Sequence, residues 1–349
     1  MHDLAFSLAA RNDLQLRMWG PLGPIPRKAS HAASPDEAEW LEHLLESGGI
    51  AHLLRSNPVK GLISALLLIL RLNRVYRRNT DIDLVHVNWL QNAIGLLGTR
   101  TPALVSVLGS DYRLLSIPGM VTLLRAVFRQ RHSVLAPNGR WMVPTLEKHF
   151  GDVAMIQYIP FGIDPRWFAI ERQWSPEGPR RWLAVLRVTE KKIGSLFEWG
   201  NDLFGDRDEL HLFGPMQEKV TIPPWVKYHG PTNPDALARD WYPGAAGVIS
   251  LSTHDEGRPQ VLLEAMAAGL PVLVSSIAAH RDLVIDGENG RLIDSSGTLH
   301  TALAELSHPQ SNLTLGKRGR AWARDNIGTW DDCAERYVNL YRQLSAGKE

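Results

Sequence analysis

The 349-residue chain contains a single cysteine, Cys333, so no disulfide can form within one molecule. Such a cysteine content suits a reducing compartment, although some secreted proteins share it. Long apolar runs are missing as well: the most apolar stretch, Leu62–Leu70, is far shorter than the roughly 20 residues that a membrane-spanning helix needs. The N-terminus lacks a basic start followed by a long apolar segment, so the sequence predicts no secretion signal.

An excess of charge of one sign is also lacking, since 38 Lys and Arg residues oppose 37 Asp and Glu residues, for a net charge of +1. We therefore expect no nucleic-acid binding through bulk electrostatics. The 13 histidines are scattered, and without clustered His or Cys ligands we expect no metal and no cofactor. The length and a hydrophobic content of 44% suffice for two domains with full cores.

The strongest pattern lies in Leu251–Ser275, LSTHDEGRPQVLLEAMAAGLPVLVS. Gly247–Leu251 and Pro271–Ser275 predict two buried strands. Gln260–Ala268 predicts a helix, with Pro259 suited to its first position because proline lacks an N–H. A strand, an acidic loop, a helix and a strand make a βαβ unit, which binds ligands at the carboxyl ends of its strands.

Two glutamates stand eight positions apart in this stretch, Glu256 in the loop and Glu264 within the helix. At ~1.5 Å per residue, Glu264 lies roughly 7–8 Å along the helix from its start. A helix N-terminus favours phosphate, and a carboxylate can accept hydrogen bonds from both hydroxyls of a ribose. A nucleotide sugar has this layout, but a paired helix-face glutamate and a solvated turn residue explain the spacing equally well.

The surrounding residues resemble the signature of retaining glycosyltransferases of family four. Their hallmark is Glu, seven residues and Glu, followed by EAMAxGxPV, which here runs from Glu256 through Glu264 to Val272. The later IDGENGRLI, Ile285–Ile293, resembles the continuation of that motif. The resemblance implies a retaining transferase that moves a sugar from a nucleotide-diphosphate sugar, with Glu256 on the donor sugar and Glu264 on the ribose.

The fold that this resemblance implies is α/β and GT-B, with two Rossmann-like domains facing across a cleft. Residues 1–165 would form the acceptor-binding domain, and residues 166–349 the nucleotide-sugar domain, after a linker at about 164–179. A helix at about 330–345 would cross back to the first domain. Compared with the family, the first domain lacks its first strand, which suggests a reading frame that starts upstream of Met1, a truncated chain, or a trimmed domain whose sheet edge needs covering.

In the family, an arginine at a strand end and a lysine five residues later neutralise the diphosphate. Arg187 and Lys192 match them here, but Ile193 replaces the usual glycine, and Lys191 is an alternative to Lys192. Two solvated basic residues are the simpler explanation of this pair. The resemblance adds Gly214 and the stretch Gly257–Gln260 to the donor site.

That stretch departs from the family, because Arg258-Pro259 stands where Phe-Gly is usual. Proline removes one amide that would touch phosphate, and Arg258 would supply charge in its place beside Gly257 and Gln260. On the acceptor side, one strand end carries Asn88 and the next carries Gly109, Ser110 and Asp111. The resemblance implies that these residues face the acceptor. Leu108 occupies the place of a family histidine, which leaves Asp111 as the candidate to contact or deprotonate the acceptor hydroxyl. A turn or N-cap aspartate is the equally simple interpretation.

Asn57-Pro58 opens a predicted helix that runs to about Arg78, apolar in its first half and rich in arginine in its second. A core helix with a solvated basic end is the simpler interpretation. The alternative is a helix on a membrane surface, with Arg74, Arg77 and Arg78 on acidic headgroups.

The sequence thus predicts a metal-independent hexosyltransferase of polysaccharide biosynthesis, cytoplasmic and peripheral on the inner face of the membrane. Its partners would be a nucleotide sugar and a saccharide or lipid-linked acceptor, with a membrane surface as a further candidate. The alternative is a catalytically weak or inactive sugar-nucleotide-binding subunit of the same fold.

Overall fold

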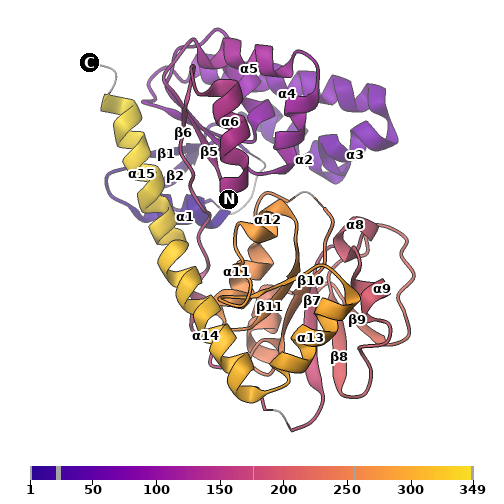
Figure 1. The fold of residues 1–349 in the computed structure, drawn as a ribbon. Coiled ribbons are helices and arrows are strands. Elements are labelled where there is room, and N and C mark those ends of the chain that lie inside the picture. The colour runs from indigo at the N-terminus through magenta and orange to yellow at the C-terminus, as the bar shows by residue number, and fades with distance from the viewer. Residues whose placement is uncertain (1, 21–24, 176, 255, 347–349) are drawn as a thin grey trace. The chain divides into compact units, whose positions relative to one another are not determined.

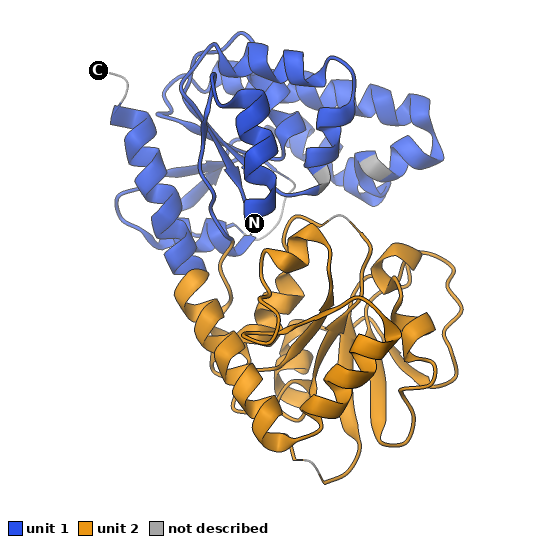
Figure 2. Ribbon diagram, in the orientation of Figure 1, with its two compact units in different colours: residues 1–160, 330–349 blue, residues 161–329 orange. Residues whose placement is uncertain are grey.

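The computed structural model describes residues 2–20, 25–175, 177–254 and 256–346, without the side chains of Ala51 and Ser110. The chain divides into two compact units: unit 1 comprises residues 1–160 and 330–349, and unit 2 comprises residues 161–329 (Figure 2). The first division falls slightly before the boundary expected at residue 165. Within the described residues, no helix is both long and apolar enough to cross a membrane.

The main sheet of unit 1 has four parallel strands in the order β3-β4-β5-β6 (Figure 1). Its strands are β3 Val85–Asn88, β4 Ala103–Val107, β5 Ser133–Pro137 and β6 Met155–Ile156. A separate parallel pair joins β1 Leu16–Met18 to β2 Ala29–His31.

The helices of unit 1 lie before, between and after these strands. They are α1 His2–Ala10, α2 Pro35–Glu46, α3 Gly49–Ser56, α4 Pro58–Arg78, η1 Leu90–Leu96, η2 Ser110–Ser116, α5 Met120–Phe128, η3 Arg140–Met142, α6 Val143–Phe150 and α15 Trp330–Ala346. The helix predicted from Asn57-Pro58 to Arg78 is confirmed as α4, and the Asn57 side chain caps it by accepting a hydrogen bond from the Lys60 amide at 3.1 Å.

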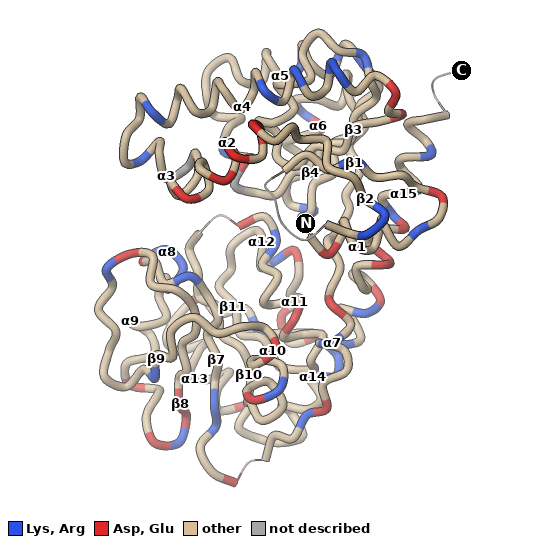
Figure 3. The backbone as a smooth tube through the Cα atoms, turned by 180° about the vertical axis from the view of Figure 1, so that it is seen from behind, with Lys and Arg blue, Asp and Glu red and all other residues tan. Residues whose placement is uncertain are grey.

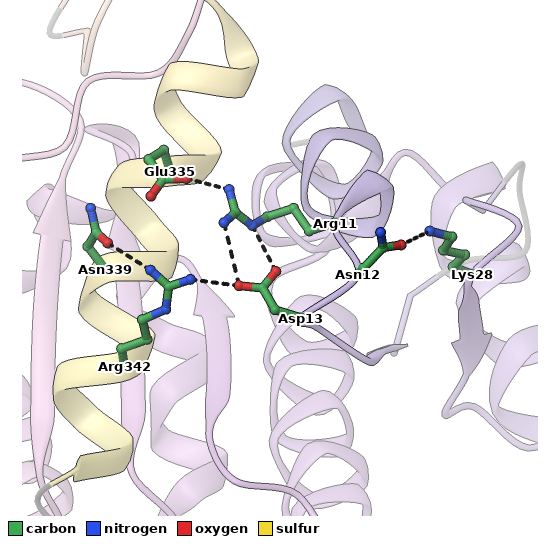
Figure 4. Close-up of polar contacts among 7 residues, drawn as sticks. All are labelled: Arg11, Asn12, Asp13, Lys28, Glu335, Asn339 and Arg342. Atoms are coloured by element: carbon green, nitrogen blue, oxygen red, sulfur yellow. Dashed lines mark hydrogen bonds and ion pairs between the residues drawn. The ribbon is translucent and has the colours of Figure 1, made fainter.

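Buried polar contacts and ion pairs attach α15 to the rest of unit 1. His86 on β3 bonds to the Tyr341 hydroxyl at 2.6 Å and to the Ser106 hydroxyl at 2.8 Å. Two ion pairs join α15 to the residues that follow α1. Arg342 donates to Asp13 at 2.7 Å, and Arg11 pairs with Glu335 (Figure 4). These contacts explain why the C-terminal helix belongs to unit 1.

Unit 2 contains a six-stranded parallel sheet in the order β12-β11-β10-β7-β8-β9. Its strands are β7 Arg180–Val185, β8 Asp208–Phe213, β9 Val226–Gly230, β10 Gly247–Ser250, β11 Val272–Ser275 and β12 Arg291–Ile293. Both faces are buried, because neighbouring residues along β10 enter different cores, Val248 on one side and Ile249 on the other. The near-continuous apolar strands of the sequence follow from this two-sided burial.

The helices of unit 2 cover both faces of that sheet (Figure 1). They are α7 Pro165–Phe168, α8 Glu190–Ile193, α9 Leu196–Gly200, α10 Pro234–Ala236, η4 Leu237–Trp241, α11 Gln260–Ala267, α12 Ala278–Arg281, α13 Ser296–Leu306 and α14 Pro309–Asn326. The predicted βαβ unit is confirmed as β10, α11 and β11. One detail was wrong: Pro259 is the N-cap with an extended backbone, and the helix begins at Gln260.

Candidate functional site

The strand order of unit 2 reverses between β7 and β10, which lie side by side in the sheet. At such a reversal, the loops that leave the two strands run in opposite directions and leave room for a ligand at the carboxyl edge. The loop after β7 carries Lys192 on α8, and the loop after β10 carries Glu256. The topology therefore brings together two residues that lie 64 positions apart in the sequence.

Backbone contacts fasten these two loops to each other. The Thr253 amide donates to the Lys191 carbonyl at 2.8 Å, and the Ser252 hydroxyl donates to the same oxygen at 3.3 Å. Gly194 lies so close that a Cβ atom there would be 1.9 Å from the Leu251 carbonyl oxygen, and its φ of +54° also disfavours a side chain. Gly194 thus provides the close approach that the sequence seemed to lose at Ile193, which is instead buried in the core.

The side chains of Lys192 and Glu256 form an ion pair, with 2.5 Å between Nζ and Oε1. The two side chains are only 15% and 12% exposed. Lys192 is fixed from its own side too, because the Thr189 hydroxyl accepts from the Lys192 amide at 3.3 Å. The structure therefore places Lys192 beside Glu256, whereas the carbonyl of Lys191 links the loops, and the diphosphate role of Lys192 remains a prediction.

His280 on α12 is a member of the site that sequence reasoning missed. It is fully buried, and its Nδ1 lies 3.0 Å from the Ser275 carbonyl oxygen at the end of β11. Burial lowers the pKa of His280, while the Glu256 carboxylate raises it and Lys192 lowers it. His280 is therefore neutral and within electrostatic reach of the ion pair, and its Nε2 has no hydrogen-bond partner among the described residues.

Nothing in the sequence separates His280 from the other twelve histidines. Its place depends on the turn after β11, where the Ser275 hydroxyl donates to the Ser252 carbonyl at 2.5 Å and links β11 to the Glu256 loop. Only the paired strands bring those serines together.

Arg258 is buried, and its expected charge contribution beside phosphate remains a prediction. Its side chain is 1% exposed and pairs with Asp282 at 3.3 Å. Gln260 is likewise engaged, since its Nε2 donates to the Gly162 carbonyl at 2.7 Å. Both side chains brace the start of α11 from within unit 2, and Gly257 beside them is buried.

Glu264 is partly buried on α11, eight positions after Glu256, which lies in the loop before this helix. Its charge and the burial of Tyr242 together raise the pKa of the Tyr242 hydroxyl, with burial the larger cause. Ribose binding by Glu264 remains a prediction.

Gly214 has a φ of +129°, and a Cβ atom there would lie 1.8 Å from the Leu186 carbonyl oxygen. Because Gly214 has no side chain, the chain just after β8 can contact the segment just after β7. Arg187 belongs to that segment, directly after Leu186. Arg187 is exposed, and in the described residues its side chain forms no hydrogen bond or ion pair with Lys192 or Glu256. The structure thus brings Lys192 and Glu256 together but leaves the diphosphate role of Arg187 a prediction.

On unit 1, Asp111 links two loops. Its Oδ2 accepts from the Leu90 amide and its Oδ1 from the Leu108 amide, each at 2.9 Å. Asp111 is 3% exposed, and burial raises the pKa of its carboxyl although backbone hydrogen bonds oppose that shift. These contacts favour the turn-aspartate interpretation, and its contact with an acceptor remains a prediction.

The other acceptor-side residues border the same loops. Asn88 ends β3 with its Oδ1 buried and without a hydrogen-bond partner in the described part of the chain. Trp89, which follows it, has a φ of +68°, a strained value for a residue other than glycine. Gly109 has a φ of +103° and precedes η2, whereas the side chain of Ser110 lies outside the described residues.

Across residues 2–20, 25–175, 177–254 and 256–346, no group of three or more His, Cys, Asp or Glu side chains is arranged to hold a metal ion. This observation does not decide whether the reaction needs a metal ion.

Comparison with known proteins identifies the domain that carries the site. Residues 194–308 match the family described as glycosyl transferases group 1. They form a group 1 glycosyltransferase domain. This group 1 domain includes Glu256, Glu264 and His280, and Lys192 lies two positions before it.

Over 123 residues, the chain is 34% identical to the D-inositol 3-phosphate glycosyltransferase of Xylanimonas cellulosilytica. That match covers 34% of this chain and 28% of the relative, so the chain spans just over a quarter of the relative's length.

Two solved structures resemble nearly the whole chain. The sucrose-phosphate synthase of Thermosynechococcus elongatus matches with a TM-score of 0.71 at 19% identity, over 99% of this chain and 92% of that one. Anabaena Alr3699/HepE in complex with UDP-glucose matches with a TM-score of 0.65 at 14% identity, over 94% of this chain and 99% of that one. With a parallel Rossmann-like sheet in each unit, the fold is GT-B, as the sequence predicted.

Proposed function

We propose that the chain is a retaining, metal-independent glycosyltransferase that takes a sugar from a nucleotide-diphosphate sugar. The observation that carries this proposal is the Lys192–Glu256 ion pair at the strand-order reversal of the unit 2 sheet, next to and partly within the group 1 domain. A cation and a carboxylate side by side suit a ligand with a diphosphate next to a hydroxyl-rich sugar. The HepE structure, solved with UDP-glucose, supports a donor of this class.

In this proposal, Lys192 takes the charge of the leaving diphosphate, and Glu256 holds hydroxyls of the donor sugar. A preorganised cation stabilises charge that develops as the sugar leaves, which lowers the barrier to transfer. Glu264, on α11 and eight positions after Glu256, holds the ribose. The leaving phosphate itself accepts the acceptor proton on the same face, so the sugar keeps its anomeric configuration.

We place the acceptor in the class of saccharides or lipid-linked saccharides, within cell-surface polysaccharide assembly at the inner face of the membrane. The resemblance to family four supports this class. Asn88 and Gly109 border the loops that would contact the acceptor, and Asp111 holds those loops in place through the Leu90 and Leu108 amides.

The test begins with a panel of UDP-, GDP-, ADP- and TDP-sugars scored by thermal shift on the purified chain. The best binder then enters a transfer assay with saccharide acceptors, with and without EDTA. We expect one donor to raise the melting temperature, transfer that survives EDTA, and a product whose anomeric configuration by NMR equals that of the donor.

Lys192→Ala should abolish the donor-induced shift, whereas the matched control Lys219→Ala, an exposed lysine of the same unit, should keep it. An inverted product would contradict retention, and loss of transfer with EDTA would contradict metal independence. Donor binding without any transfer or donor hydrolysis would instead favour a sugar-nucleotide-binding subunit.

A further inference from the structure

The first half of α4 is apolar yet lies at the surface of unit 1. Only Gly61, Leu72 and Val75 of this 21-residue helix are buried. Six apolar side chains of α4 are between 40% and 69% exposed: Val59, Leu62, Ile63, Leu66, Leu67 and Leu70. The expectation of a core helix is therefore wrong for this half, since its apolar residues do not face the core.

These six residues, here named the apolar stripe, lie on one side of the helix. Their spacings of three and four positions place them within an arc of about 140° at roughly 100° per residue. Such a stripe is the face by which a helix normally packs. A monomeric protein rarely leaves a continuous apolar patch of this kind uncovered.

The opposite side of α4 is held by close packing. A Cβ atom on Gly61 would lie 2.5 Å from the backbone nitrogen of Leu54, so α3 and α4 touch backbone to backbone at this point. Leu72 and Val75 attach the second half of α4 to unit 1. The stripe is therefore presented outward by a supported hairpin of α3 and α4.

The charge of this hairpin has one sign. Residues 49–78 contain six Lys and Arg residues and no Asp or Glu. Arg74 follows Leu70 by one helical turn on the stripe side, and Lys60 lies at its edge near the start of α4. Basic positions are visible along α4 in Figure 3, and acidic ones along neighbouring α2.

Not all of the arginines are available to an external partner. Arg78 donates to Glu37 and to the Ala32 carbonyl, each at 2.6 Å, and the Arg71 guanidinium lies 4.6 Å from the centre of the Trp40 ring. Arg78 was expected to reach lipid headgroups, and its ion pair with Glu37 places it against α2 instead. Lys60 and Arg74 remain as exposed cations beside the stripe.

We propose that the apolar stripe of α4 docks unit 1 onto an anionic lipid bilayer. The helix lies in the plane of the interface with its leucines among the acyl chains, and Lys60 and Arg74 extend to acidic headgroups. A second copy of this chain fits less well, because two-fold pairing of the stripes would bring like charges together. This inference rests on the membrane location given in the proposed function and assigns a surface to it, and it holds whatever sugar the second unit binds.

The test measures binding of the full-length chain to sedimented vesicles, either phosphatidylcholine alone or phosphatidylcholine with phosphatidylglycerol. Replacing Leu62→Ser, Leu66→Ser and Leu70→Ser together should reduce binding to the anionic vesicles at least about 100-fold, or about 2.8 kcal/mol. Replacing Lys60→Gln and Arg74→Gln together should reduce it about 30-fold, because each of the two cations near an anionic surface contributes on the order of 1 kcal/mol.

The matched control replaces three apolar residues exposed singly elsewhere, Ile117→Ser, Met155→Ser and Ile285→Ser, and should bind like the unmodified chain. Circular dichroism melting confirms that each variant is folded, as expected for exposed positions. The proposal is overturned if the unmodified chain binds neither vesicle, or if the triple leucine variant binds as well as the control. Sedimentation velocity that shows self-association lost only in the leucine variant would assign the stripe to a second copy instead.

Discussion

Replacing Glu256 with glutamine should separate donor binding from sugar transfer. Glu256→Gln keeps the size of the side chain and its ability to accept a hydrogen bond, but it removes the charge that pairs with Lys192 at 2.5 Å. In the unmodified chain, a diphosphate must compete with this carboxylate for the lysine. In the variant, that competition and the repulsion between carboxylate and phosphate both disappear.

The structure sets the size of the effect. At 2.5 Å and an effective dielectric constant of about 20, the gross attraction between the two charges is roughly 6–7 kcal/mol. The cost of burying both charges offsets most of it, which leaves a net value on the order of 1–2 kcal/mol for a partly buried pair. Nucleoside diphosphate should therefore bind the variant with equal or up to about tenfold higher affinity. Transfer should fall at least about 100-fold, as for other lost groups that position the reacting centre.

Isothermal titration calorimetry with the nucleoside diphosphate and initial-rate assays of transfer measure the two effects on the same preparation. Glu288→Gln, an exposed glutamate of unit 2, serves as the control and should change neither. A variant that loses tenfold or more in nucleoside diphosphate affinity while keeping its turnover would refute the assignment of Glu256 to the sugar.

Three further changes test other parts of the structure. Glu264→Ala should weaken nucleoside diphosphate binding about tenfold by calorimetry, and unchanged affinity would remove its ribose role. Asp111→Ala leaves the buried Leu90 amide and the part-buried Leu108 amide without this acceptor and should lower the free energy of unfolding in urea by roughly 2–4 kcal/mol, whereas a loss below about 0.5 kcal/mol would contradict its loop-linking role. Burial lowers the pKa of His86 to about 3, so the stability that its neutral form provides is complete above about pH 6.5 and falls as the pH drops toward 3. Between pH 7.5 and 5 that loss is at most about 2 kcal/mol, and His86→Gln should remove it, so an unchanged pH dependence in the variant would contradict the assignment.

The strands and the helix of the βαβ unit in unit 2 could be predicted from local sequence patterns. The strands around residues 247–250 and 272–275 are apolar throughout because the sheet is buried on both faces. The helix between them is set by strong helix formers and ends before Gly269, whose φ of +74° suits a helix C-terminus. Such signals depend on residues close in sequence, so they can be recognised without the structure.

The parts that sequence reasoning missed depend on contacts between distant residues. His280 enters the site through Ser275 and the pairing of β11 with β10, which no spacing reveals. The burial of Arg258 against Asp282 depends on packing between residues 24 positions apart, which the sequence pattern does not reveal. Gly194 replaces the glycine expected at position 193, because the loop shifts the close approach by one residue.

The direction in which the apolar face of α4 points could not be predicted from the sequence either. Its periodic apolar residues predict a helix with one apolar face, and that helix is present. Periodicity does not say whether the face points to the core or to an external partner. Only the packing of Gly61 against α3 shows that the apolar stripe points outward.

The central claim is that the loops after β7 and β10 bind a nucleotide-diphosphate sugar through Lys192 and Glu256. The most direct measurement is the affinity of the best donor from the panel for the unmodified chain, for Lys192→Ala and for the control Lys219→Ala. The account predicts that the unmodified chain and the control bind alike and that Lys192→Ala binds at least about 100-fold more weakly, as for the loss of a charged phosphate contact. Equal affinity in all three proteins, or no binding of any nucleotide sugar, would contradict it.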